Sequence, residues 1–228
     1  MFLGTIVNAT LIIIGSLMGL GFKKGIPKGF ETIILNGIAL TVCVMGIDYA
    51  LASTNILQVI VSIVLGSIIG EWWNIERALE KFGNNIKKKL LTKIKFDNST
   101  FVEGMMTATL LYCVGSMTIM GALDSGLRGE HSILFTKSFM DGITSILFAN
   151  SMGIGVMFSV IPLVIYQGLI TLFAATIEPF LDPMLIEQIS AVGGILLIGL
   201  SLNILEIKHI KVANMLPAML IMVIIFLL

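Results

Sequence analysis

The chain has 228 residues, of which 57% are hydrophobic and only 12% are charged, and its mean hydropathy is +1.02. A globular domain carries roughly a quarter of charged residues, so this composition predicts a polytopic membrane protein and excludes an ordinary soluble domain. The formal net charge is +0, from 14 basic and 14 acidic residues, which leaves no basic surface for nucleic acid.

A membrane-spanning helix needs about 20 predominantly apolar residues. The sequence therefore predicts an all-α polytopic fold with about eight transmembrane helices, at residues 1–22, 32–51, 55–72, 101–123, 133–153, 155–176, 186–205 and 212–228. The fifth and sixth stretches join almost without a loop, so two full spans and a re-entrant pair both remain open. The first stretch has no charged residue ahead of its apolar run, so it is expected to be retained as a span.

Basic residues gather on one side of this arrangement. Twelve of the 14 Lys and Arg residues lie in the loops after the first, third and seventh predicted helices. Because cytoplasmic loops carry an excess of Lys and Arg, these loops are predicted to lie inside and both termini outside the cell. Residues 74–95 hold apolar side chains at helical spacing among charged residues. This pattern predicts an amphipathic helix on the inner membrane surface, either as a topological anchor or, alternatively, for partner binding.

Two parts of the sequence resemble each other. Ala9-Thr10-Leu11 followed by Gly15-Ser16 recurs as Ala108-Thr109-Leu110 followed by Gly115-Ser116, and Asn36-Gly37-Ile38 recurs as Asp141-Gly142-Ile143. Each unit would hold three helices, so the second must be inverted in the membrane, as is typical of secondary transporters. We expect a first repeat at residues 1–73, a surface helix and linker at 74–100, an inverted repeat at 101–180 and a C-terminal helix pair at 181–228.

Polar residues inside the fifth and sixth predicted spans are the candidate binding site. An ionisable side chain in a membrane is costly and points to function, and helical spacing puts Lys137 and Asp141 on one face. The candidate substrate- or ion-binding residues are Asp141, Lys137, Asn36, Thr144, Ser145 and Gln167. Asn36 is included because it occupies the Asp141 position of the first repeat. The alternative interpretation is a purely structural salt bridge near the outer end of its helix.

No enzyme is predicted. The sequence has no metalloprotease, nucleophile-elbow or phosphate-loop motif, and His131 and His209 fall on opposite predicted sides, so no metal and no cofactor are expected. Cys43 and Cys113 lie in apolar runs and predict small buried side chains. The leading hypothesis is a small-solute or ion transporter or channel, and the alternative is a non-transport scaffold or accessory subunit of a membrane complex. The expected partners are the lipid bilayer and a small solute or ion, with a homo-oligomer left open and nucleic acid excluded.

Several motifs resemble a known family. They are Gly4-Thr5-Ile6-Val7-Asn8, Phe101-Val-Glu-Gly104, Cys113-Val-Gly-Ser116, Gly121-Ala-Leu-Asp124, Lys137-Ser138 with Asp141-Gly142, Gly153-Ile-Gly155-Val156 and Gln167-Gly-Leu-Ile-Thr171. Together they resemble the YdfK/YqgA-like family of uncharacterised bacterial inner-membrane proteins, over essentially the whole chain. The resemblance implies a multi-pass protein of the bacterial cytoplasmic membrane and, from the usual label of its members, transport. It carries over no substrate.

The predicted orientation can be tested with single cysteines in a background that lacks Cys43 and Cys113. Cysteines at Ser125 and Thr54 should react with an impermeant thiol reagent added outside, while one at Asn84 should react only after permeabilisation, because the basic loops define the inner side. Outside labelling of Asn84 would reverse the orientation.

Overall fold

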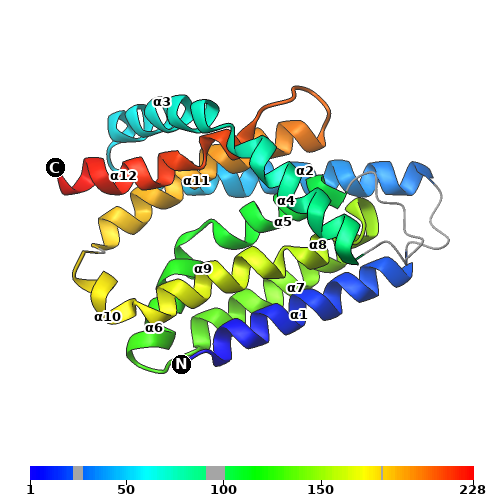
Figure 1. Cartoon of the computed structure of the whole chain (residues 1–228), viewed down its shortest axis with the longest axis horizontal. Coiled ribbons are helices and arrows are strands. Elements are labelled where there is room, and N and C mark those ends of the chain that lie inside the picture. The colour runs from blue at the N-terminus through cyan, green and yellow to red at the C-terminus, as the bar shows by residue number, and fades with distance from the viewer. Residues whose placement is uncertain (23–27, 91–100, 181) are drawn as a thin grey trace. The chain divides into compact units, whose positions relative to one another are not determined.

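A computed structural model describes residues 1–22, 28–90, 101–180 and 182–228, and every regular element in these ranges is helical (Figure 1). The helices are α1 (Leu3–Phe22), α2 (Lys28–Leu51), α3 (Ile56–Trp73), α4 (Ile75–Leu90), α5 (Phe101–Cys113), α6 (Ser116–Leu127), α7 (Ser132–Met152), α8 (Gly155–Phe158), α9 (Val160–Leu172), α10 (Ala174–Ile177), α11 (Pro183–Ile204) and α12 (Pro217–Leu227). Two short 3₁₀ turns, η1 (Glu178–Phe180) and η2 (Val212–Met215), complete the elements. The prediction of an all-α membrane protein is confirmed.

Six helical segments in the described ranges are long and apolar enough to cross a membrane. They are α1, the α2 segment Thr32–Leu51, α3, α7, the α8–α9 segment Gly155–Leu172, and α11. The stretch predicted at 101–123 is a bent pair of helices, and the last predicted stretch is the shorter apolar segment Val212–Leu227. Residues 91–100 of the predicted linker and the basic residues Lys23 and Lys24 lie outside the described ranges.

The helices form two compact units. Unit 1 contains Met1–Leu35 and Asn85–Phe180, and unit 2 contains Asn36–Asn84 and Leu181–Leu228. The three divisions fall inside α2, inside α4 and after η1, so neither unit is continuous in sequence. The predicted boundaries at residues 73, 100 and 180 stay a prediction.

In unit 1, α1 and α7 pack side by side and run in the same direction (Figure 1). Gly4 lies against Leu134, Gly15 against Gly142, and Gly19 against Ile146, so both residue numbers rise together. A Cβ at Gly15 or Gly19 would overlap a backbone carbonyl oxygen of α7. Small residues permit this close approach of two backbones, which drives helix association in lipid.

The prediction of one continuous helix at residues 101–123 is wrong, because the segment is broken. The chain breaks between α5 and α6 with a bend of 65°, and Gly115 at the break has φ 113° and ψ 149°. This backbone conformation is essentially restricted to glycine. The Thr118 hydroxyl donates to the Tyr112 carbonyl oxygen across the break, at 3.0 Å.

Helices α6 and α9 also run in the same direction. The Thr171 hydroxyl donates to the Ala122 carbonyl oxygen at 3.1 Å, and Gly126 one turn later in α6 meets Thr171 and Ala174. The preceding interruption between α8 and α9 falls at Ser159. Pro162 lies three residues further on and has no N–H to donate into the helix ladder, which accounts for the interruption.

In unit 2 the helices pair in opposite directions. Ser62, Gly66 and Gly70 of α3 meet Met222, Ala218 and Asn214 in that order, so α12 runs antiparallel to α3. Likewise Gly46 of α2 lies against Gly194 and Ile198 of α11, while the Gln188 amide bonds the hydroxyls of Ser53 and Thr54, both at 2.8 Å. Helix α11 is therefore antiparallel to α2.

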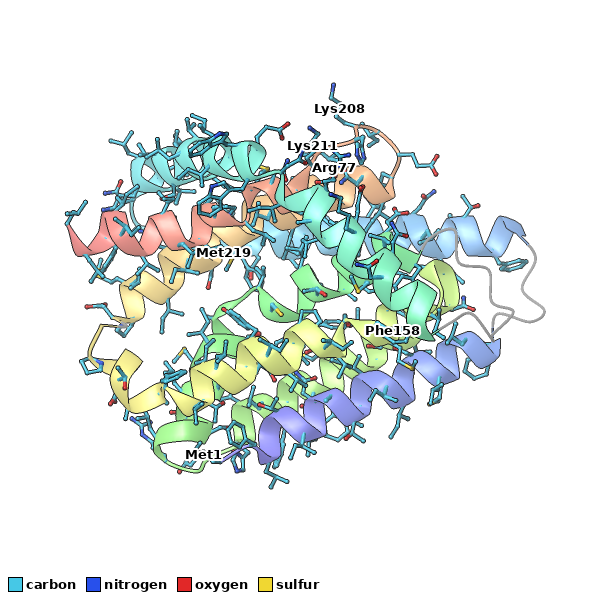
Figure 2. All side chains as sticks on the ribbon, in the orientation of Figure 1. Met1, Arg77, Phe158, Lys208, Lys211 and Met219 are labelled. Carbon is cyan, nitrogen blue, oxygen red and sulfur yellow. The ribbon has the colours of Figure 1, made fainter. Side chains whose placement is uncertain are left out.

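A polar cluster fixes the corner where α3 passes into α4. Asn74 takes a left-handed conformation with φ 53°, and Asn214 accepts from the Glu76 backbone N–H at 2.7 Å. Glu71 accepts from both Lys211 and Asn214, each at 2.6 Å. Figure 2 labels Lys211, and Arg77 of α4, at this corner. Burial raises the pKa of Glu76, whereas the hydrogen bond to Glu71 raises the pKa of Lys211.

The expected labelling of a cysteine at Ser125 is wrong. Ser125 lies inside α6, is fully buried, and its hydroxyl lies 2.8 Å from His131 Nδ1, so a cysteine there would be shielded. Arg128 directly follows α6 and its side chain is 66% exposed, so it is the better reporter position.

The close approach of α1 to α7 predicts that alanine substitutions lower stability at the contacting glycines of α1 and not at Gly21. Gly15→Ala and Gly19→Ala should each lower the free energy of unfolding by about 1–3 kcal/mol, because overpacking a well-filled contact forces backbone shifts. Gly21→Ala is the matched control in the same helix, since a Cβ there meets nothing within 4 Å. Thermal unfolding in detergent measures all three, and an equal loss at Gly21 would contradict the packing argument.

Candidate functional site

A buried ion pair lies in the interior of unit 1. The Lys137 ammonium donates to both carboxylate oxygens of Asp141, each at 2.9 Å, and the two residues are 6% and 5% exposed. The predicted i,i+4 spacing on one helix face is confirmed by this geometry. An ion pair removed from water in this way must be neutralised by close contact, because desolvating either charge alone costs several kcal/mol.

A second helix completes the coordination of the carboxylate. Asn8 of α1 donates from its side-chain nitrogen to Asp141 Oδ2 at 3.1 Å, which is the interhelical hydrogen bond expected of an amide within a span. Asp141 is the tenth residue of α7, about 14 Å along the helix at 1.5 Å per residue. The hydrocarbon core is about 30 Å thick, so the pair is near the middle of this helix rather than at its end.

A chain of hydrogen bonds leads from Asp141 to the broken helix. The Ser145 hydroxyl donates to the Asp141 carbonyl oxygen at 2.7 Å, and the Tyr112 hydroxyl lies 2.7 Å from the Ser145 oxygen. Because the Ser145 proton is already engaged, Tyr112 is the donor in this contact. Tyr112 is fully buried and directly precedes the end of α5, so the ion pair and the break are neighbours.

Unsatisfied polar atoms are concentrated in the same unit. Among the described residues, nine buried side-chain oxygens and nitrogens have no hydrogen-bond partner, and eight of them belong to unit 1. They lie on Thr5, Asn8, Ser16, Thr107, Asn150, Ser151 and Gln167. Unit 2 holds only Glu76 Oε2. A buried polar group without a partner costs about 1–3 kcal/mol, so the interior of unit 1 is suited to water or a polar solute.

The predicted site residues separate into three groups. Lys137, Asp141 and Ser145 come together as one network. Thr144 lies beside this network in sequence but is partly exposed, and its hydroxyl donates to the Met140 carbonyl oxygen within its own helix at 2.7 Å.

The remaining two predicted residues are Gln167 and Asn36. Gln167 is fully buried on α9, with neither side-chain atom paired. Asn36 is a half-buried residue of α2 assigned to unit 2, and its predicted approach to Asp141 stays a prediction.

Sequence reasoning missed Tyr112 and the break that follows it. The available signal is a Gly-Ser pair in mid-span, with a threonine hydroxyl two residues on that can bond back to the chain. The same Gly-Ser pair at Gly15-Ser16 stays helical in α1, so the pair by itself does not identify a break.

Chemically, the site offers a paired charge and a set of uncharged donors and acceptors. No group of three His, Cys, Asp or Glu residues in the described ranges is arranged to hold a metal ion. The Lys137 and Asp141 charges are paired with each other, and the unpaired polar groups buried in the same unit are hydroxyls and amides. These groups can form hydrogen bonds with water or with a polar solute.

Removing one partner of the buried pair should be far more damaging than removing both. Asp141→Asn leaves the Lys137 charge buried and unpaired and should cost about 3 kcal/mol or more of unfolding free energy. The double change Lys137→Met with Asp141→Leu should recover most of this loss, because apolar replacement of a buried pair is often neutral. Unfolding midpoints of purified protein measure both variants.

Asp124 and Arg128 provide the matched control. They form an i,i+4 ion pair at 3.2 Å whose Arg128 side chain is 66% exposed. Asp124→Asn should cost less than about 1 kcal/mol, as is usual for exposed pairs. If Asp141→Asn were as mild as Asp124→Asn, the buried pair would not be an organising contact of the unit.

Comparison with known proteins places the chain in a family. A family model described as "Protein of unknown function (DUF554)" matches residues 3–227. The chain is 36% identical over 222 residues to the uncharacterized membrane protein YdfK of Bacillus subtilis (strain 168), covering 96% of this chain and 93% of that protein. It is 32% identical over 224 residues to the uncharacterized protein YqgA of Escherichia coli (strain K12), covering 96% and 94%. No solved structure matches the chain. The chain therefore belongs to the DUF554 family of membrane proteins, together with YdfK and YqgA, and the predicted resemblance is confirmed.

Proposed function

We propose that this protein is a transporter or channel for a small solute or ion, and that its polar site lies in the interior of unit 1. The observation that carries the proposal is the ion pair of Lys137 and Asp141 beside an interrupted helix. Secondary transporters typically bind substrate near the bilayer midplane at discontinuous helices. The break between α5 and α6 divides a 27-residue segment into helices of 13 and 12 residues, so it falls near mid-span, as Asp141 does.

The distribution of polar atoms supports the same proposal. Most buried polar groups in folded proteins are satisfied, because each unpaired group costs stability. Here eight unpaired atoms gather in one of the two units among the described residues. Contact with a passing solute or with water explains why such a costly lining would be retained.

Eight membrane crossings fit the helix directions within each unit. Helices α1 and α7 are parallel, so an odd number of crossings must connect them, and α2, α3 and the bent pair α5–α6 supply three. A re-entrant α5–α6 pair would supply none and would make α1 and α7 antiparallel. The antiparallel pairs α3–α12 and α2–α11 each require an even number of intervening crossings, and the same count supplies four.

The same count supports an inverted repeat. Helices α1, α2 and α3 would cross in alternating directions starting from one side, and α5–α6, α7 and α8–α9 would start from the other. With the basic loops inside, both termini face the outside of the cytoplasmic membrane. The bend at Gly115 has no counterpart at Gly15, so the two repeats have diverged at that position.

Flux through purified protein tests the proposal. Wild-type protein reconstituted in liposomes should carry at least one member of a panel of inorganic ions and small organic acids, alcohols and amino acids, detected by isotope uptake or by current on a supported membrane. The Lys137→Met, Asp141→Leu double variant should fold, as argued above, and lose that flux by at least tenfold. An Asp124→Asn, Arg128→Gln variant, which removes the exposed pair, should retain it.

Two results would remove the proposal. One is the absence of flux of every panel compound through folded wild-type protein, with the protein inserted in the liposomes in both orientations. The other is a flux that the double variant carries at the wild-type rate. Either would favour a membrane scaffold or accessory subunit.

A further inference from the structure

The break between α5 and α6 leaves a helix N-terminus inside unit 1. Gly115 is the N-cap of α6 and supplies no side-chain cap. The first backbone bond of the helix runs from Thr118 N–H to the Gly115 carbonyl oxygen, at 3.2 Å, so the N–H groups of Ser116 and Met117 precede it. Unsatisfied N–H groups and the helix dipole together give such an end a partial positive charge that suits an anion.

Gln167 is the second observation at this place. It is fully buried, and neither its Nε2 nor its Oε1 has a hydrogen-bond partner. A primary amide has two N–H donors and an oxygen that can accept two hydrogen bonds. Burying the whole group without a partner therefore costs stability. A ligand that offers one acceptor and one donor would satisfy both ends of the amide at once.

The fold directs Gln167 toward the start of α6. The buried face of α9 consists of Leu163, Gln167 and Thr171, which follow one another at four-residue spacing. Thr171 meets Ala122 of α6, and the two helices are parallel, so the helical register puts Gln167 one turn before Thr171, level with Thr118 of α6. Helical side chains tilt toward the N-terminus of their own helix, which carries the amide further toward Gly115.

The nearby acid does not oppose an anion here. Asp141 is connected to the end of α5 through Ser145 and Tyr112, but its charge is cancelled by two contacts with Lys137. The paired acid therefore adds no net negative charge beside the helix N-terminus.

We propose that the N-terminus of α6 and the Gln167 amide bind the carboxylate of a small organic acid. The carboxylate oxygens accept from the first N–H groups of α6 and from Gln167 Nε2. Gln167 Oε1 accepts from a hydroxyl or ammonium group carried next to the carboxylate, as in an α-hydroxy or α-amino acid. This assignment rests on the proposed transport function and names the substrate class of the same unit.

Equilibrium binding to the full chain tests this site without requiring flux. The probes are sodium glycolate, sodium acetate and sodium chloride at equal sodium concentration, and the readouts are the unfolding midpoint and titration calorimetry in detergent. Glycolate should bind and raise the midpoint, acetate should do so more weakly because it lacks the hydroxyl, and chloride should have the smallest effect because it offers no donor to the Gln167 amide oxygen.

Substitutions at Gln167 separate binding from folding. Gln167→Leu removes two unpaired buried polar atoms, so the ligand-free protein should be at least as stable as wild type. It should bind glycolate about tenfold or more weakly, as expected for loss of a hydrogen bond to a charged group. Gln167→Asn keeps both amide groups on a shorter stem and should retain partial binding.

Gln188 is the matched control. It is a glutamine with 1% exposure in unit 2 whose amide is bonded to Ser53 and Thr54. Gln188→Leu should lower stability and leave the glycolate affinity unchanged.

The site and the transport proposal can fail separately. Unchanged glycolate binding in Gln167→Leu, or a chloride response equal to that of glycolate, would overturn the carboxylate site. Glycolate binding that depends on Gln167 in a protein without flux would uphold the site and remove transport. Flux that is unaffected by Gln167→Leu in a protein that binds no glycolate would do the reverse.

Discussion

The ion pair between Lys137 and Asp141 sets the constraint that organises unit 1. Lipid cannot solvate either charge, so α7 must bury that face against protein. Helix α1 meets the requirement by approaching over Gly15 and Gly19 and by presenting Asn8 to the carboxylate. Helix α5 adds Tyr112 through Ser145. Close backbone packing and polar coordination are thus two aspects of one requirement.

The two units solve different physical problems. In unit 2, the membrane helices meet through backbone contacts at Gly46, Gly66, Gly70 and Gly194, and the buried Gln188 amide is fully engaged. In unit 1, several amides and hydroxyls are buried without partners in the part of the chain that is described. The close contacts and paired amide of unit 2 favour a rigid packing, whereas the unpaired polar groups of unit 1 favour the binding of water or a solute.

Sequence periodicity predicted those features that depend on local spacing. Apolar runs located the spanning segments, and the four-residue separation of Lys137 and Asp141 predicted their shared face. The break at Gly115 was beyond such reasoning, because Gly15-Ser16 has the same local sequence and remains helical. What distinguishes the two glycines is tertiary: one permits contact with Gly142, and the other adopts a conformation closed to other residues.

The direction of Gln167 depended on helix pairing in the same way. Its burial could be expected from an apolar span, but its position beside α6 follows from the parallel packing of two helices whose contact residues, Ala122 and Thr171, are 49 residues apart in sequence. The predicted approach of Asn36 rests on repeat symmetry alone. Side-chain spacing along one helix does not carry such information across the bundle.

The interruption at Gly115 also has a mechanical consequence. A continuous helix resists bending because each turn is held by several ladder bonds, whereas α5 and α6 are joined by a glycine and by the side-chain bond from Thr118 to Tyr112. One such bond contributes about 0.5–1.5 kcal/mol, equivalent to roughly a tenfold bias or less at room temperature. The backbone ladder therefore does not fix the angle between the two half-helices, which depends instead on their contacts with α7 and α9. The break thus replaces one stiff spanning helix by two short helices that meet beside the buried ion pair.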